Sequence, residues 1–328
     1  MNTHHLGYEA IHTYFDQSLP PRLTINPGDT VVFATRESSY GRIARLFVAN
    51  SDPSIPADLA AIIAASAYPE IATPLAGHPL TGPVHIEGAG PGDTLVVAIL
   101  EIKPASWGWT SVRPGGGLLG DETIQRTMQY WDLRQGDYAQ FASGVRIPLE
   151  PFCGMLGVAP ETSGLLPTAS PRNSGGNMDI RQLVVGSTLY LPVFVLGALF
   201  SVGDVHAVQG DGEVSGTAIE CDATVTLQFD LLKGQAIAAP QFRTSGPIAP
   251  RTDTGPSFAA TGHSTNLHEA ARIALRGIID YLEREHCIAR PRGCILASIC
   301  VHLHISQIVN AETYTVTAFL PLSIFDTR

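Results

Sequence analysis

One run near residue 220 constrains the fold of this chain more than any other feature. Between Ile219 and Phe229, apolar residues alternate strictly with more polar ones. Such alternation is typical of a β-strand with one buried face, because successive side chains point to opposite sides of a sheet. The 32 glycines and 24 prolines among 328 residues favour frequent turns over long helices. The sequence therefore predicts a body built of many short strands.

The tetrapeptide Pro-Gly-Asp-Thr occurs twice, at residues 27–30 and 91–94. Each copy precedes an apolar, mostly β-branched run, so each predicts a turn between extended segments of a hairpin-like element. The two copies have two interpretations: a weak internal duplication, or two independent uses of a common turn.

Two helices are expected. The first is short and alanine-rich, starting near Pro56 and stopping before Pro69. The second runs over residues 265–286, where apolar residues recur at helical spacing and Thr265 or Asn266 offers an N-cap. Residues 294–309 and 313–325 are expected to form strands after it, and residues 107–150 are expected to be rich in loops.

These elements predict a mainly β fold with an α+β portion, in which a helix–strand–strand element ends the chain. We expect residues 1–328 to form one unit. The order of the expected elements also allows a subdivision into two parts. Residues 1–150 would form a β-rich N-terminal part, and residues 151–328 would contain a β block with the candidate functional residues, followed by the α+β portion.

Charge and motifs exclude several classes of function. The net charge of −10 argues against nucleic acid or an anionic membrane as partner, because both attract basic surfaces. The first residues lack the features of a signal peptide, and no apolar stretch approaches the roughly 20 residues that span a bilayer. The five cysteines include no CxxC pair, which favours a reducing cytoplasm. No GxSxG elbow, Walker loop or dinucleotide fingerprint is present.

The candidate functional residues are concentrated between Gly203 and Glu220, where four acids and one histidine are interleaved with four glycines. Asp204 and His206 are two residues apart, so on a strand they share a face and can reach one divalent cation. The glycines allow Asp211 and Glu213 to fold back toward the same point. The alternatives are a simple Asp211-Gly212 hairpin turn with a solvated Glu213, a structural His206, and a Glu220 on the solvated face of the next strand.

A second segment is expected to contribute to the same site: residues 175–179, Gly-Gly-Asn-Met-Asp. Asn177 and Asp179 share a face if the chain is extended there. The alternative is a glycine turn with an asparagine cap. His302 and His304 face one way on a strand and either bind metal or substrate or lie within a core or interface. His78 and His85 flank the turn at residues 81–83, and spacing does not place them at the site.

The sequence resembles the acetamidase/formamidase family. The resemblance rests on PFCGMLGVAP at residues 151–160, GGNMD at 175–179, the long string LPVFVLGALFSVGDVHAVQGDGEVSGTAIE at 191–220, and TGPVHIEGAGPGDTL at 81–95. It extends in order from about Leu23 to Phe325. The resemblance implies a β-sandwich-like body with an α+β portion, and hydrolysis of short linear amides to carboxylate and ammonia with the help of a bound metal ion.

Carried over by residue, the resemblance implies a site of eight residues: Asn177, Asp179, Asp204, His206, Gln209, Asp211, Glu213 and Glu220. Four of them are expected as metal ligands: Asp179, Asp204, His206 and Glu220. Asp211, Glu213, Asn177 and Gln209 are the catalytic candidates, with Glu213 as the base that activates water and with the two amides orienting the substrate. Zinc is the first expectation for the metal, and manganese and calcium are the alternatives. No organic cofactor is expected.

Two other readings of function remain at this point. A related hydrolase would act on a larger or cyclic amide, and a non-catalytic module would bind calcium through the same acids. The expected partner is a small amide in the cytoplasm, with no nucleic acid and no membrane. The large apolar content also favours a homo-oligomer.

Overall fold

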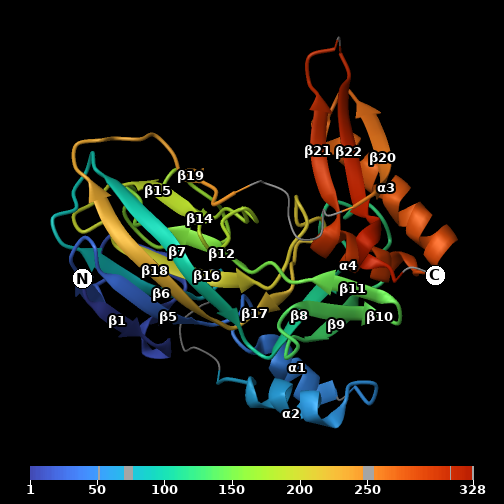
Figure 1. Ribbon diagram of the computed structural model, residues 1–328, viewed down its shortest axis with the longest axis horizontal. Coiled ribbons are helices and arrows are strands. Elements are labelled where there is room, and N and C mark those ends of the chain that lie inside the picture. Colours follow the sequence, from blue (N-terminus) through green and yellow to red (C-terminus); the bar gives the residue numbers. More distant parts are fainter. Residues whose placement is uncertain (51, 70–76, 247–254, 311, 327–328) are drawn as a thin grey trace. The chain divides into compact units, whose positions relative to one another are not determined.

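In a computed structural model, the chain is described over residues 1–50, 52–69, 77–246, 255–310 and 312–326. The chain divides into two compact units, each assembled from three separate segments (Figure 1). Unit 1 comprises Met1–Trp107, Pro151–His206 and Glu220–Ile248, and unit 2 comprises Gly108–Glu150, Ala207–Ile219 and Ala249–Arg328. Strands predominate, so the prediction of a mainly β fold with an α+β portion is confirmed.

The first sheet of unit 1 has six strands in the order β1-β5-β18-β7-β15-β19. In chain order they are β1 (Thr3–Leu6), β5 (Thr30–Thr35), β7 (Thr94–Pro104), β15 (Thr188–Pro192), β18 (Ala223–Leu232) and β19 (Gln241–Arg243). Only β1 and β5 run parallel; the other neighbours are antiparallel. Strand β18 contains the strictly alternating run and lies between β5 and β7, near the middle of the sheet.

The second sheet carries the candidate site. In unit 1 its strands are β2 (Ile11–His12), β4 (Leu23–Ile25), β6 (Leu80–Ile86), β12 (Phe152–Gly157), β14 (Gly175–Asn177), β16 (Phe200–His206) and β17 (Glu220–Cys221). Strand β16 pairs with β12, β6 and β17, all antiparallel. All seven residues of β16 are buried, so its polar side chains are held away from bulk water.

The two sheets pack face to face through aromatic side chains. Phe200 of β16 makes edge-to-face contacts with Phe33 of β5 and Phe229 of β18, with ring centroids 6.1 and 5.0 Å apart. All three side chains are fully buried. Burying large rings in such offset geometries stabilises a core beyond the area they remove from water. Unit 1 therefore has the sandwich-like body that the resemblance implied.

The two Pro-Gly-Asp-Thr turns do not form hairpins. The first joins β4 to β5 and the second joins β6 to β7, and in both cases the chain passes from the second sheet to the first. Each aspartate accepts backbone N–H groups: Asp29 from Asn2 and Asn26, and Asp93 from Gly90 and Gly234. The expectation of similar elements was right, and the hairpin pairing was wrong because consecutive strands enter different sheets.

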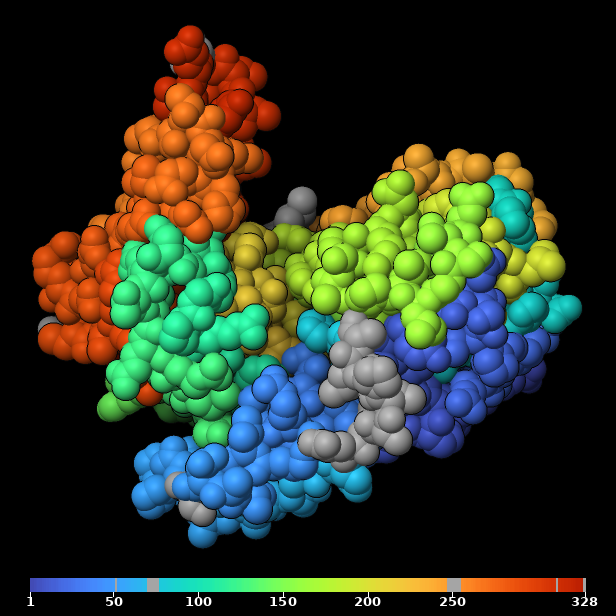
Figure 2. Space-filling view, turned by 180° about the vertical axis from the view of Figure 1, so that it is seen from behind, coloured from blue at the N-terminus to red at the C-terminus, as the bar shows by residue number. Residues whose placement is uncertain are grey.

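Two short helices and a small strand pair complete unit 1. Helices α1 (Arg42–Asn50) and α2 (Ala57–Ala65) follow β5, and α2 confirms the helix expected after Pro56. Figure 2 shows both, in blue, at the surface of this unit. A 3-10 turn at Tyr8–Ala10 follows β1, and β3 (Tyr14–Phe15) pairs with β13 (Leu166–Pro167).

Unit 2 contains β-strands in its first segment and an α+β element in its last. The strands are β8 (Trp107–Val112), β9 (Thr127–Asp132), β10 (Tyr138–Ala142), β11 (Val145–Pro148), β20 (Ser257–Ser264), β21 (His302–Gln307) and β22 (Tyr314–Pro321). The helices are α3 (Leu267–His286) and α4 (Arg290–Cys300), and a 3-10 turn covers Leu322–Ile324. Strands β20, β22 and β21 form an antiparallel sheet in that order.

Helix α3 confirms the long helix predicted from the sequence. Asn266 is its N-cap, and its side chain accepts a hydrogen bond from the backbone N–H of Glu269 at 3.1 Å. The helix lies close against β20 because Gly262 has no side chain; a Cβ there would meet the backbone oxygen of Ala270 at 2.0 Å. The stacked rings of Phe258 and Tyr281 add to this contact.

One local expectation was wrong. Residues 294–300 belong to helix α4, and the expected strand begins only at His302. The helix is buried on all sides from residue 293 to 300, so its sequence shows no polar stripe that would reveal a helical period. Residues 107–150 contain four strands in addition to their loops.

Among the helices within the described ranges, none combines the length and apolarity that crossing a membrane requires.

Candidate active site

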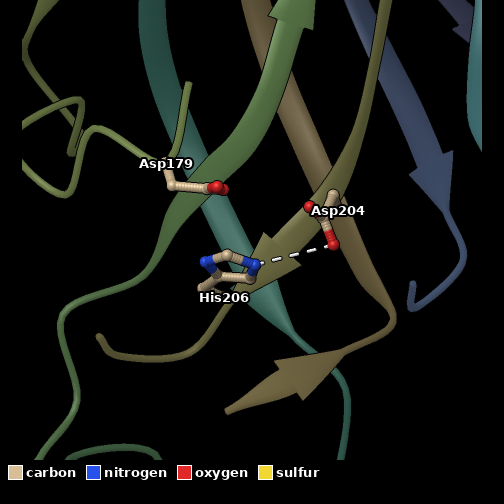
Figure 3. A group of neighbouring side chains, drawn as sticks. All are labelled: Asp179, Asp204 and His206. Carbon is tan, nitrogen blue, oxygen red and sulfur yellow. Dashed lines mark ion pairs between the residues drawn. The ribbon is translucent and has the colours of Figure 1, made fainter. Parts of the chain in front are cut away.

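Asp204 and His206 lie on β16 with their side chains turned toward one another (Figure 3). His206 Nε2 is 3.5 Å from Asp204 Oδ1, and both side chains are at most 2% exposed. Asp204 has a φ of 53°, in the left-handed region that aspartate enters more readily than most residues. The ring of Phe152 packs edge-to-face on His206, with centroids 5.1 Å apart. The shared face predicted for Asp204 and His206 is therefore confirmed.

Asp179 reaches this pair from the turn after β14. Ligand atoms of Asp179, Asp204 and His206 all lie within 4.8 Å of one another. The turn is fixed because the carbonyl oxygen of Gly154 accepts the backbone N–H groups of both Met178 and Asp179, each at 3.1 Å. Asp179 also has a left-handed φ, of 50°, so it does not continue the strand that the sequence suggested.

Glu220 reaches His206 from the neighbouring strand. Glu220 of β17 is the direct pairing partner of His206 of β16, and Glu220 Oε2 lies 3.5 Å from His206 Nε2. The carboxylate is only 3% exposed. The alternative that Glu220 occupies a solvated strand face was wrong, because β17 turns this side chain onto β16 before the exposed face of β18 begins.

The sequence did not place two further residues that the structure brings to the cluster. His78, two residues before β6, has its Nδ1 3.0 Å from Asp204 Oδ2. Gly154 of β12 faces the same group: a Cβ there would lie 2.7 Å from Asp179 Oδ1 and 2.9 Å from His206 Cε1. Gly154 is part of a motif that carries the resemblance, but only the pairing of β12 with β16 shows why it is glycine.

The electrostatics of the cluster are set by burial and by opposite charges. Burial raises the pKa of Asp179 to about 7, with the imidazole of His206 opposing the shift. Burial also disfavours the ionised form of Asp204, but His78 and His206 outweigh it and hold the pKa of that carboxyl well below its usual range. For His206, burial lowers the pKa, whereas Glu220 and Asp204 outweigh it and raise the pKa well above its ordinary value.

This donor set fits a divalent cation. His206 lies beside Asp204, Asp179 and Glu220 in a buried position, where acids without a cation or other partner are costly. Asp204 Oδ1 is buried and has no conventional hydrogen-bond partner among the described residues. Its neighbour His206 Nε2, at 3.5 Å, lies at the outer limit of hydrogen-bond distance. Oxygen-rich sets with one histidine suit zinc, manganese and calcium. Asp179, Asp204, His206 and Glu220 are thus candidate ligands by geometry as well as by sequence.

The four remaining predicted residues are distributed over both units. Asn177 ends β14 in unit 1, and its Nδ2 donates to the carbonyl of Ala169 at 3.3 Å. Gln209, Asp211 and Glu213 belong to the segment of unit 2 that connects β16 to β17. Gln209 is buried, and Asp211 Oδ2 lies 3.6 Å from both His302 Nδ1 and His304 Nε2.

Asp211 is therefore more than a simple turn residue within unit 2. Its backbone N–H also donates to His302 Nδ1, at 3.4 Å. His302 is buried and His304 is exposed, so the two histidines share one side of β21 but not one environment.

Cys153, on the strand beside this group, is not a nucleophile. Cys153 is fully buried, and burial raises the pKa of its thiol to about 12. A thiol with that pKa carries almost no thiolate at neutral pH, so Cys153 is an inert residue of the core.

Comparison with known proteins shows the family. A profile described as Acetamidase/Formamidase family matches residues 3–166 and 163–327, so this chain belongs to that family. The chain is 26% identical to a formamidase of Methylophilus methylotrophus over 96% of its own length and 89% of the relative's. It is 28% identical to an acetamidase of Mycolicibacterium smegmatis, covering 68% of this chain and 66% of that one.

Solved structures show the same architecture. A gamma lactamase from Delftia acidovorans superimposes with a TM-score of 0.81 at 25% identity, covering 97% of this chain and 90% of that one. The chain is accordingly an amidase, a hydrolase that acts on C–N bonds. This membership favours an enzyme over the non-catalytic calcium-binding module.

Proposed function

We propose that this amidase hydrolyses short linear amides of the formamide and acetamide class to a carboxylate and ammonia, with a divalent cation held by Asp179, Asp204, His206 and Glu220. The observation that carries the proposal is that the buried carboxylates of Asp204 and Glu220 each lie 3.5 Å from His206 Nε2, with a ligand atom of Asp179 within 4.8 Å of those of Asp204 and His206. The named activities of the two sequence relatives support the substrate class.

The chemistry of an unactivated amide sets three requirements: a nucleophile, stabilisation of the tetrahedral oxyanion, and a proton for the departing nitrogen. A divalent cation, when bound, lowers the pKa of water toward about 7 and polarises a carbonyl oxygen. Asp179, Asp204 and Glu220 supply the negative charge that would hold it, and His206 supplies one neutral nitrogen. Zinc is our first choice, with manganese and calcium as the alternatives.

Proton transfer requires a further group. We assign it to Glu213, which would accept a proton from the attacking water and deliver it to the leaving ammonia. Glu213 lies on the connection between the two ligand-bearing strands, β16 and β17. Asn177 and Gln209 are assigned to orient the amide, and Asp211 stays a catalytic candidate. Replacement of Glu213 by Gln removes the base while keeping the side-chain shape, so kcat should fall by at least about 100-fold.

Ammonia release from formamide, acetamide and propionamide tests the whole proposal. The purified protein is assayed before chelation, after chelation, and after adding back zinc, manganese or calcium. Turnover that disappears with the chelator and returns with one metal supports the proposal. Full activity in protein shown by elemental analysis to be metal-free would refute the role of the cation.

A second candidate substrate is a cyclic amide. It is favoured by one observation, the TM-score of 0.81 with a protein described as a gamma lactamase. Including a five-membered lactam in the same assay separates the two. Ring opening leaves the amine attached to the product, so loss of the lactam is followed directly instead of ammonia.

Two further expectations from composition stay predictions: a cytoplasmic location, and self-association into a homo-oligomer. Light scattering coupled to size exclusion measures the second directly.

A further inference from the structure

His78 lies closer to the carboxylate of Asp204 than His206 does. Its Nδ1 lies 3.0 Å from Asp204 Oδ2, whereas the other oxygen, Oδ1, lies 3.5 Å from His206 Nε2. The two oxygens of one carboxylate are therefore directed to different partners. A hydrogen bond from His78 to Oδ2 fixes the rotation of the carboxylate and directs Oδ1 toward His206.

The backbone around His78 is fixed on both sides. Its carbonyl oxygen accepts a hydrogen bond at 3.1 Å from the buried hydroxyl of Thr168. The preceding Gly77 lies so close to this threonine that a Cβ would come within 2.0 Å of Thr168 Oγ1. On the other side, a Cβ on Gly203 would lie 2.4 Å from the carbonyl oxygen of Pro79.

These contacts place the imidazole. Leu80, the first residue of β6, pairs with Gly203 and sets β6, which follows His78 in the chain, antiparallel to the strand containing Asp204. The backbone that carries the ring is therefore positioned by the register of β6 against β16, and the ring itself by its contact with Asp204.

We propose that His78 is a positioning residue, which holds the carboxylate of Asp204 in the orientation that a divalent cation requires. The inference rests on the proposed function, because it assigns His78 a role toward the cation site. Residues that hydrogen-bond to metal ligands restrict the ligand's orientation, and their loss typically lowers metal affinity about 10- to 100-fold. His78 would act through Asp204 and need not touch the substrate.

Direct measurement of zinc binding tests this role. Protein stripped with a chelator is titrated with Zn²⁺ against a competing indicator dye, without any amide present. We expect His78→Ala to weaken zinc binding about 10- to 100-fold. His78→Gln retains a side-chain N–H donor and should recover most of the affinity.

The chain offers a matched control in the same unit. His4 pairs with Asp29 at 3.2 Å in a similar imidazole–carboxylate contact that is not part of the cluster. His4→Ala should leave zinc affinity unchanged, and thermal unfolding of all variants shows whether they fold.

The outcomes separate the two proposals. Folded His78→Ala protein that binds zinc as tightly as wild type would overturn the positioning role while the cation site stands. An equal loss in His78→Ala and His78→Gln would overturn the hydrogen bond as its basis. Wild-type protein that binds none of zinc, manganese and calcium would overturn both proposals.

Discussion

His206 and Glu220 face each other as paired residues of neighbouring strands, with His206 Nε2 3.5 Å from Glu220 Oε2. Thirteen residues of chain separate them in sequence, all belonging to unit 2. The pairing of β17 with β16 therefore brings the chain back beside His206, the last residue of β16. Because both side chains project from hydrogen-bonded strands, their separation is set by the sheet rather than by a loop.

Gly154 gives the sharpest test of the cluster's close packing. A methyl group at this position would lie 2.7 Å from Asp179 Oδ1 and 2.9 Å from His206 Cε1, so these side chains must move. We expect Gly154→Ala to weaken zinc binding at least about tenfold, as expected when ligands are displaced from their productive positions. Gly90→Ala is the control, since its Cβ would meet nothing closer than 3.8 Å. Unchanged zinc affinity in Gly154→Ala would show that the cluster tolerates the displacement.

Zinc affinity should rise with pH. The pKa of His206 lies well above its ordinary value and that of Asp179 is about 7, so both groups hold protons that a cation must displace near neutrality. Loss of at least one proton on binding makes the affinity increase about tenfold or more per pH unit between pH 6 and 7. Calorimetry in two buffers with different ionisation enthalpies counts the protons released. Asp179→Asn should release fewer below pH 7, and equal release in both proteins would contradict the assignment.

His12 should make unit 1 sensitive to acid. Its Nδ1 donates to the carbonyl of Tyr14 at 2.8 Å, its Nε2 lies 2.9 Å from Ser201 Oγ, and burial lowers its pKa from 6.5 to about 4. The unfolded chain therefore binds a proton between pH 6.5 and 4 that the folded state excludes, and stability is lost as pH falls through this window. The upper bound is on the order of 3 kcal/mol.

The contribution of His12 is isolated by comparing two proteins. Urea unfolding at pH 7 and at pH 4.5 is measured for wild type and for His12→Gln, which does not titrate. The stability of the variant should fall less across this interval. If both proteins lose the same free energy of unfolding, His12 is not the acid-sensitive group.

Glu122 should stabilise unit 2 through two arginines. Its Oε1 accepts from Arg276 Nε at 2.8 Å, its Oε2 accepts from Arg290 Nε at 2.7 Å, and these contacts lower the pKa of the carboxyl. Because the carboxylate is only partly exposed and contacts Arg290 with both oxygens, Glu122→Gln should cost about 1–2 kcal/mol.

The exposed pair Arg284–Glu285 supplies the comparison for that network. Glu285→Gln should change the free energy of unfolding by less than about 0.5 kcal/mol. Thermal melts at low and high salt measure both variants. An effect of Glu122→Gln no larger than that of Glu285→Gln would argue against a stabilising network.

The sequence was most informative where the relevant geometry is local. The i, i+2 spacing of Asp204 and His206 defines a shared strand face, and the apolar and capping residues near Asn266 define a helix. Both patterns need only a few neighbouring residues, and both are found in the structure. Helix α4 was misread because its buried stretch carries no polar stripe to distinguish a helix from a buried strand.

His78 and Gly154 mark the limit of that approach. Their contribution depends on the register of β6 and β12 against β16, which joins residues 44 or more positions apart in the chain. The left-handed backbone of Asp179 and Asp204 is equally invisible in the sequence, because nothing local distinguishes these aspartates from ordinary strand residues.

The interleaving of the two units has a consequence for synthesis of the protein. The chain passes between units after residues 107, 150, 206, 219 and 248, so no single cut separates one unit from the other. Residues 108–150 leave the ribosome long before the C-terminal segment of their unit exists. Their folding must wait for partners more than 100 positions downstream, a topology that slows folding and prolongs exposure of apolar surface. Deletion of either terminal segment should therefore yield aggregated chains instead of an autonomous half.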